Sequence, residues 1–462
     1  MSSATRRQSD VKQGVPFIAA LASAVAYALA FEPFGLGPVA WVALVPMLVA
    51  VHFARLDVAF ACGLLFGFVQ AAISIHWMVG MFGPLGIFLF AIYGTYYAIA
   101  VALIRASTKA WGPGALLWAA PSVWVAVEWI RSETWWLKFS WFTAGSSQHA
   151  DLWLAQTASW WGVYGLSVLV ISANAAVAWV IIDRKKWPVP AVVIVLVAAL
   201  HGVGASMMDR EEGDLPVAMI EGETSHPPDF EAKIDEAMAR APRTQVIVLP
   251  EYSTGARVTA ESDPFTRYSA AAKRYGVTIV FGGTRDAGPT FENTLFVIGR
   301  DGALAGTQVK SVPLPFFRDG LPAKERRPVE GLGCATCYDM DFPFVARDLA
   351  ANGAELFVFP TMDASDWGRI QHRQHAELAA LRAIEHRRWL IRCASSGVSL
   401  TVDPWGRVTE GKEIVFASVK RRAGRTFYSR AGFWLPRLCA IAMLVIVAAA
   451  VIRERRTVKS AA

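Results

Sequence analysis

Residues 244–251 read TQVIVLPE, a run of apolar, β-branched side chains that ends on a carboxylate. A short apolar run of this kind predicts a strand buried on both faces, as in a sheet that helices cover. Similar runs occur at 216–222, 276–284, 293–299, 333–340, 354–361 and 389–406. Helical patterns lie between several of them, for example DFEAKIDEAMARA at 229–241. Strands that alternate with helices predict a layered α/β domain over residues 207–432.

Three predicted strand ends carry reactive side chains. Glu251 follows VIVLP, Lys310 precedes a proline-rich turn in GTQVKSVPLPFF (306–317), and Cys337 ends the strand predicted for CATCYD. A carboxylate beside a thiol can take its proton and so produce the thiolate nucleophile. A lysine can stabilise the oxyanion that then forms, with the backbone N–H of Tyr338 as a second donor.

The rest of the chain has the composition of a membrane protein. Of its 462 residues, 54% are hydrophobic and only 18% are charged, whereas soluble domains are nearer a quarter charged. Apolar stretches long enough to cross a bilayer predict seven spans before the α/β domain and one after it. We place them at 16–31, 38–54, 58–80, 84–105, 114–131, 160–182, 188–206 and 434–452. The expected domains are therefore 1–206, with seven spans, 207–432, and 433–462, with the last span and a tail.

Basic residues predict the orientation of these spans. The net charge is +7, but the Lys and Arg residues form short clusters beside apolar stretches, which argues against a nucleic-acid partner. With eight spans, four clusters fall on the same side, which should be cytoplasmic. They are Arg6, Arg7 and Lys12; Arg105 and Lys109; Arg184, Lys185 and Lys186; and Arg453, Arg455 and Arg456. The α/β domain is then expected on the outer face of the membrane.

Cys334 and Cys337 form a CxxC pair that allows three interpretations. A zinc site needs two more soft ligands at similar spacing, and none is evident nearby. A thioredoxin-like pair usually begins a helix, whereas this stretch reads as a strand through Cys334. The third interpretation is a single nucleophile, Cys337, with Cys334 as a strand residue that could form a reversible disulfide with it in an oxidising compartment. His372, His375 and His386 lack a suitably spaced carboxylate and are interpreted as part of a surface or active-site-rim helix rather than as metal ligands.

The motifs VLPE, Lys ahead of Val-Pro, and CYD resemble the Glu-Lys-Cys triad of the nitrilase (carbon–nitrogen hydrolase) superfamily. With spans on both sides, the resemblance is to its membrane branch, the apolipoprotein N-acyltransferase family. It extends over nearly the whole chain, including LAFEPFGLGPVAWVALVPML, APSVWVAVEWIR, FSWFTAGSSQHAD and TFYSRAGFW. This resemblance implies a four-layer αββα sandwich on the outer face of a bacterial inner membrane.

The resemblance also implies a two-step acyl transfer. Cys337 takes an acyl chain from a phospholipid, with Glu251 as general base and Lys310 at the oxyanion. The thioester then acylates the N-terminal amine of a diacylglyceryl-cysteine lipoprotein. Tyr338 and, less directly, Asp339 are the implied supporting residues. No metal or other cofactor is needed, and a monomer is expected.

Several positions depart from the family pattern. Where the family continues Val-Pro-Phe-Gly-Glu after the lysine, with a functional glutamate, this chain reads VPLPFFRDG. The segment between Lys310 and Cys337 is shorter than is typical, and Asp339 replaces the family's glutamate after the tyrosine. Two alternatives therefore stay open: a membrane-tethered amidase or esterase that uses water as acceptor, and an inactive relative that binds lipoprotein or lipid.

Overall fold

The computed structural model describes residues 3–186, 188–255 and 257–461. The chain divides into two compact units. The first contains Met1–Thr157, Val163–Ser206 and Phe433–Ala462, and the second contains Ala158–Gly162 and Met207–Gly432. The units are described one at a time below.

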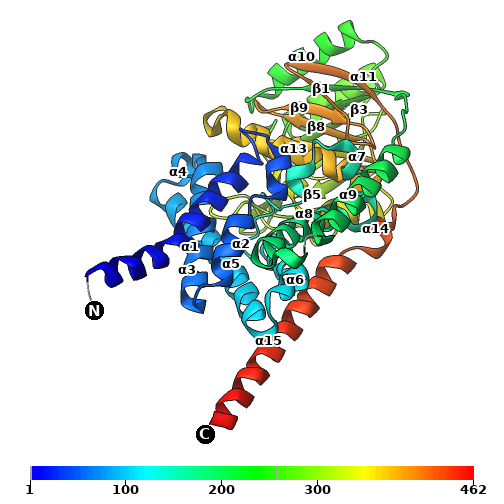
Figure 1. Ribbon diagram of the computed structural model, residues 1–462. Helices are drawn as coiled ribbons and strands as arrows, with labels where there is room; N and C mark the ends of the chain where they lie inside the picture. The colour runs from blue at the N-terminus through cyan, green and yellow to red at the C-terminus, as the bar shows by residue number, and fades with distance from the viewer. Residues whose placement is uncertain (1–2, 187, 256, 462) are drawn as a thin grey trace. The chain divides into compact units, whose positions relative to one another are not determined.

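The first unit is helical, and its helices are labelled in Figure 1. They are α1 (Ser3–Leu29), α2 (Val45–His52), α3 (Leu56–Ser74), α4 (Trp77–Phe82), α5 (Pro84–Trp111), α6 (Leu116–Trp129), α7 (Leu152–Ala155), α8 (Ala158–Ile182), α9 (Pro188–Met207) and α15 (Trp434–Ala461). The first five residues of α8 and the last residue of α9 belong to the second unit. The backbones of α3 and α5 lie very close together at Gly63. A Cβ added to this residue would lie 2.4 Å from the Tyr97 carbonyl oxygen. Only glycine permits this approach of two backbones.

Four helices of the described residues are long and apolar enough to cross a membrane: Leu56–Ser74, Pro84–Trp111, Ala158–Ile182 and Arg184–Met207. Three shorter apolar helices cover Gly14–Leu29, Gly37–His52 and Trp434–Ala450. The region predicted as one span at 58–80 is broken, because α3 ends at Ser74 and α4 starts separately at Trp77. The predicted span at 114–131 contains a helix of only 14 residues, α6. The eight-span topology therefore stays a prediction.

The second unit contains two β-sheets. The six-stranded sheet has the order β11-β1-β2-β3-β4-β5, and the five-stranded sheet has the order β10-β9-β8-β7-β6. Their strands are β1 (Leu215–Ile220), β2 (Val246–Val248), β3 (Thr278–Ala287), β4 (Thr290–Ile298), β5 (Leu304–Val309), β6 (Leu332–Cys334), β7 (Leu356–Thr361), β8 (Leu390–Ala394), β9 (Ser399–Val402), β10 (Val408–Gly411) and β11 (Ile414–Val419). In each sheet a parallel core of three strands, β1-β2-β3 or β6-β7-β8, continues into antiparallel strands.

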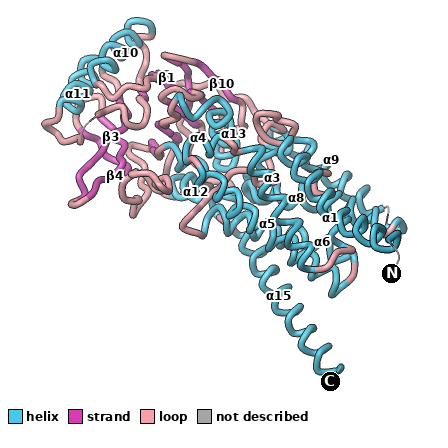
Figure 2. Tube along the Cα trace, turned by 90° about the vertical axis from the view of Figure 1, so that its left-hand side faces the viewer, coloured by secondary structure: helices cyan, strands magenta, loops and turns pink. Residues whose placement is uncertain are grey.

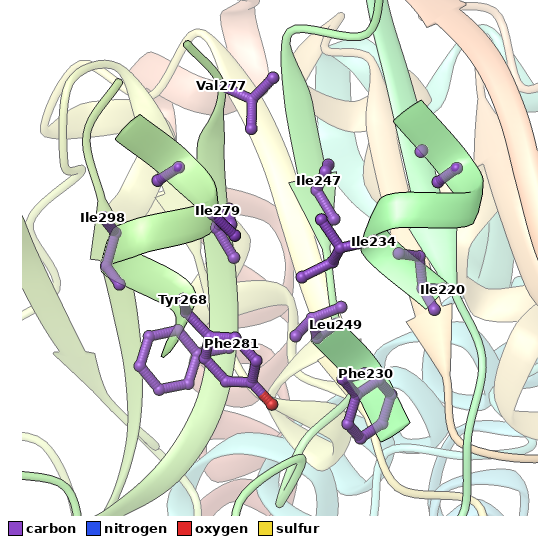
Figure 3. Packing of buried hydrophobic residues seen from close by; sticks show 14 of the residues in the cluster. Ile220, Phe230, Ile234, Ile247, Leu249, Tyr268, Val277, Ile279, Phe281 and Ile298 are labelled. Atoms are coloured by element: carbon purple, nitrogen blue, oxygen red, sulfur yellow. The ribbon is translucent and has the colours of Figure 1, made fainter. Parts of the chain in front are cut away.

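Helices cover the outer face of each sheet. Figure 2 shows α10 (Pro227–Arg240) and α11 (Asp263–Tyr275) over the strands β1 and β3. Phe230 and Ile234 of α10 and Tyr268 of α11 pack against apolar side chains of these strands, as Figure 3 shows. The second sheet packs in the same way against α12 (Pro343–Ala351) and α13 (Gly368–His386). A short helix, α14 (Phe427–Ala431), follows the last strand.

A third apolar cluster lies between the two sheets. Side chains alternate along β1, so that Ala218 and Ile220 face the helices while Val217 and Met219 face the other sheet. Val358 of β7 contributes to the inter-sheet cluster from the opposite side. The order of layers is therefore helix, sheet, sheet, helix, and burial on both faces explains why the strands read as nearly continuous apolar runs.

Candidate active site

Strand ends of both sheets position the three predicted reactive side chains. Glu251 follows β2 by three residues, Lys310 directly follows β5, and Cys337 follows β6 by three residues. All three are buried, with exposed fractions of 3%, 1% and 3%. Burial of a carboxylate and an ammonium group is costly unless they pair, so their environment must supply partners.

Lys310 lies between two carboxylates. Its Nζ is 2.9 Å from Glu251 Oε1 and 2.8 Å from Asp319 Oδ2. Asn293 Nδ2 donates to the same two carboxylates, at 2.7 Å to Glu251 and 2.8 Å to Asp319. Burial by itself lowers the pKa of the Lys310 ammonium, but the charges of Glu251 and Asp319 outweigh it and hold that pKa well above its usual value. Lys310 is therefore a permanent positive charge in the site.

Cys337 is held in a sharp turn rather than at the end of a strand. The predicted strand over 333–340 is wrong beyond Cys334, because a 3-10 helix begins at Cys337 and ends at Asp341. The φ of Cys337 is +49°, a left-handed conformation that costs a non-glycine residue about 1–2 kcal/mol. Such strain often marks a functional residue, since folding alone gives no reason to keep it.

The backbone of Met362 contacts both the Cys337 thiol and the Glu251 carboxylate. Its backbone N–H donates to Glu251 Oε2 at 3.0 Å, and its carbonyl oxygen lies 3.6 Å from the Cys337 Sγ donor. Burial, followed by the Glu251 charge, raises the pKa of the Cys337 thiol well above its usual value, and Lys310 opposes this. The resting thiol is therefore neutral and needs a base when it attacks. This arrangement suits nucleophilic attack of a sulfur on an acyl carbonyl, with a carboxylate to take the proton and an ammonium nearby for the oxyanion.

Tyr338 and Asp339 occupy the turn itself. Tyr338 packs its ring edge-on against Phe342, with centroids 4.8 Å apart, and its backbone N–H lies in the first turn of the 3-10 helix. The Asp339 carboxylate accepts backbone N–H bonds from Ser311, Val312 and Thr336 at 2.7–3.1 Å. Burial raises the pKa of Asp339 to about 6, although these donors favour its charged form. Asp339 thus ties the turn after Lys310 to the turn that carries the thiol.

Asp339→Ala is expected to destabilise this unit. It removes the acceptor of three buried N–H groups, and the loss should be about 3 kcal/mol, or roughly 10 °C in the melting temperature of a domain of this size. Thermal unfolding of the full chain in detergent micelles measures it. Asp348→Ala is the matched control, because Asp348 pairs with Arg326 at a partly exposed site, where an ion pair contributes little. Equal melting temperatures for the two variants would contradict this role of Asp339.

The sequence-based prediction missed three members of the site. Asp319, Asn293 and Met362 all contact the predicted residues, but only Asp319 carried a signal, as the acidic residue of VPLPFFRDG. Tyr252 also reaches Asp319, to which its hydroxyl donates at 2.8 Å. The family's glutamate has no counterpart at its usual place, but an aspartate nine residues after Lys310 contacts the lysine directly.

Cys334 belongs to a different environment from Cys337. Its side chain packs in the cluster between the two sheets and is 1% exposed, and burial raises the pKa of its thiol to about 12. Both cysteines are free thiols. A disulfide between them would take Cys334 out of this core, so the predicted redox switch has a cost in packing and stays a prediction.

The helix that contains the predicted histidine face is also buried. His372 Nε2 lies 2.9 Å from the Ala364 carbonyl oxygen, His375 Nδ1 lies 2.8 Å from Asp363, and His386 Nδ1 lies 2.8 Å from Ser429 Oγ. Each histidine thus has a protein partner. The interpretation as a surface helix is wrong for these positions, because all three side chains are buried, and the interpretation as an active-site-rim helix stays a prediction.

Two family models match the chain. The apolipoprotein N-acyltransferase N-terminal domain matches residues 23–176, and carbon-nitrogen hydrolase matches residues 217–423. The chain is 29% identical to the apolipoprotein N-acyltransferase of Gloeobacter violaceus, over 96% of each chain. It is 26% identical to that of Geobacter metallireducens, over 95% of this chain and 96% of the relative. Among solved structures, Saccharomyces cerevisiae Nit3, a member of the nitrilase superfamily, aligns with 48% of this chain and 94% of its own at 23% identity and a TM-score of 0.39.

Proposed function

We propose that this chain, which belongs to the apolipoprotein N-acyltransferase family, transfers an acyl chain from a phospholipid to the N-terminal amine of a diacylglyceryl-cysteine lipoprotein. The observation that carries the proposal is the buried contact of Lys310 with Glu251, with Met362 bonded to both Glu251 and the Cys337 thiol. A base, a cation and a nucleophile within one carbon–nitrogen hydrolase domain are the groups that acyl transfer through a thioester requires.

The first half of the proposed reaction acylates the enzyme. Cys337 Sγ attacks the ester carbonyl of the phospholipid while Glu251 takes the thiol proton. The Lys310 ammonium and the Tyr338 backbone N–H stabilise the oxyanion of the tetrahedral intermediate. When the intermediate collapses, the C–O bond breaks, Glu251 returns the proton to the leaving oxygen, and a lysophospholipid departs. A thioester on Cys337 remains.

The second half transfers the acyl chain. The neutral amine of the lipoprotein attacks the thioester carbonyl, and Glu251 accepts a proton from the developing ammonium. The C–S bond then breaks, an amide forms, and the proton returns to the sulfur. Asp319 keeps Lys310 charged through both halves, which is the role we propose for it in place of the family's loop glutamate.

We further propose that the protein lies in a bacterial inner membrane as a monomer, with about eight spans and the catalytic domain on the periplasmic face. The apolar helices and the basic clusters beside the predicted spans support this topology. The proposed substrates fit such a location, because both are anchored in the bilayer and present their reacting groups at its surface.

One experiment separates transfer from hydrolysis. The purified full chain in micelles is given a phospholipid and a synthetic diacylglyceryl-cysteine peptide, and the peptide mass is followed. We expect the peptide to gain one acyl chain and lysophospholipid to accumulate in equal amount. Release of free fatty acid with no change in the peptide would instead identify a membrane-tethered hydrolase. The short segment between Lys310 and Cys337 favours that second candidate, because less chain covers the thioester against water.

A further inference from the structure

A buried ionic cluster lies directly behind Cys337. The Asp363 carboxylate follows β7 and is 2.5 Å from Arg392 Nη2 and 2.8 Å from His375 Nδ1. Arg392 also donates to the Val398 carbonyl oxygen at 2.5 Å, and His375 Nε2 lies 3.3 Å from Asp341 Oδ1. The side chains of Asp363, His375 and Arg392 are at most 3% exposed. The proposed acyl transfer uses none of them.

The cluster is joined to the reacting groups through one residue. Met362 immediately precedes Asp363, and its N–H and carbonyl oxygen contact Glu251 and the Cys337 thiol. Asp363 is itself anchored through its carbonyl oxygen, which accepts the hydroxyl hydrogens of Ser395 and Ser396 at 3.2 and 2.6 Å. Asp363 is therefore fixed by its side chain and its carbonyl oxygen, directly beside the Met362 backbone that contacts base and nucleophile.

We propose that Asp363 and Arg392 are positioning residues, which place the Met362 backbone against Glu251 and Cys337 and balance the charge around the thiol. A buried ion pair rarely adds net stability over an apolar core, so its presence beside a nucleophile calls for a further role. The proposal deepens the acyl transfer described above and rests on Cys337 being the nucleophile of that reaction.

Charged groups surround the thiol from each element packed against it. Glu251 follows β2, Lys310 follows β5, Asp339 lies on the same turn as Cys337, and Asp363 follows β7. Behind these lie Asp319, Asp341, His375 and Arg392. After burial and Glu251, the Asp363 charge also raises the pKa of the Cys337 thiol. Removing the negative charge of Asp363 should therefore lower the pKa of the Cys337 thiol, and removing the positive charge of Arg392 should raise it.

The test measures alkylation of Cys337 by iodoacetamide in the full chain in detergent micelles, with the modified cysteine identified by peptide mass spectrometry. At fixed pH near 8, Asp363→Asn is expected to react about tenfold faster than wild type and Arg392→Gln about tenfold slower, since one pKa unit changes the thiolate fraction tenfold. The double variant should lie between them. If Arg392→Gln does not fold, the double variant is compared with Asp363→Asn alone and is expected to react more slowly.

Arg382 and Glu385 supply the matched control. They form a buried ion pair at 2.5 Å on α13, the helix that also carries His375. Arg382→Gln and Glu385→Gln should lower the melting temperature but leave the alkylation rate of Cys337 unchanged. If Asp363→Asn and Arg392→Gln both react faster, the variants have only made Cys337 more accessible to iodoacetamide, and the proposal is overturned. Equal rates in all variants also overturn it. Alkylation needs no lipid, so these outcomes are independent of whether acyl transfer to a lipoprotein peptide is found.

Discussion

Cys337→Ala is expected to abolish acyl transfer, with a loss of at least about 10⁴-fold in the rate of peptide acylation. The reason is chemical, because without the sulfur no thioester forms and neither half of the reaction has a path. The rate is measured as acylated diacylglyceryl peptide per minute, with enzyme amounts matched.

Cys334→Ala is the control for this substitution. It makes the same chemical change three residues earlier, in the inter-sheet core, and should cost stability through lost packing while activity per folded molecule is kept. If Cys334→Ala and Cys337→Ala lose activity to the same extent, the loss reflects damage to the turn rather than removal of a nucleophile.

Lys310→Met is expected to produce the largest loss of stability in the catalytic domain. It leaves Glu251 and Asp319 as two buried carboxylates without their cation, and breaking a buried pair in this way costs about 3–5 kcal/mol. Acyl transfer should also fall by about 10²–10³-fold, because the oxyanion loses a charged donor. Thermal unfolding of the full chain in micelles measures the first effect and peptide acylation measures the second.

The stability of Lys310→Met should change with pH in the opposite direction to the stability of wild type. In wild type, burial tends to raise the pKa of Asp319, but Lys310 outweighs it and holds that pKa below its usual value. The stability that Asp319 contributes is therefore present above its unfolded pKa and is lost as the pH falls through the folded value. In the variant, burial without Lys310 favours protonation of the Asp319 carboxylate, so the stability deficit should shrink as the pH falls from 7 to 5.

Lys310→Met/Asp319→Asn supplies the matched comparison. Neutralising Asp319 removes one of the two unpaired charges, so the double variant should unfold at a higher temperature than Lys310→Met alone, yet it should remain inactive. A double variant less stable than the single variant would show that the Asp319 charge is not what Lys310 offsets.

The strands and the reactive residues at their ends were predictable because their signals are local. The run at 244–251 contains β2 and ends on Glu251, and 216–222 contains nearly all of β1. A strand buried on both faces has to be apolar over its whole length, so its position can be predicted from its own sequence without knowledge of its neighbours. Lys310 directly follows β5, but this strand, LAGTQV, is only partly buried and is not a continuous apolar run, so the signal there was the proline-rich turn after the lysine.

Features that depend on distant contacts were not predictable in the same way. Asp319 lies in a stretch, FFRDG, that is typical of a solvated turn, and its contact with Lys310 depends on the path of the whole loop. Cys337 was assigned to the end of a strand because the residues before it continue a short, largely apolar run. The pair Thr336 and Asp339 form a capping box, and this Thr-x-x-Asp spacing was the one local signal for the 3-10 helix. The Asp363 cluster joins three elements and has no signature in any one of them.

The most direct test of the central claim is the intact mass of the wild-type chain after incubation with phospholipid and no acceptor. We predict a gain of one acyl chain, located on Cys337 by peptide mapping and lost when a diacylglyceryl-cysteine peptide is added. An unchanged mass under reducing conditions, while the peptide is nevertheless acylated, would contradict a thioester at Cys337 and with it the mechanism proposed for this site.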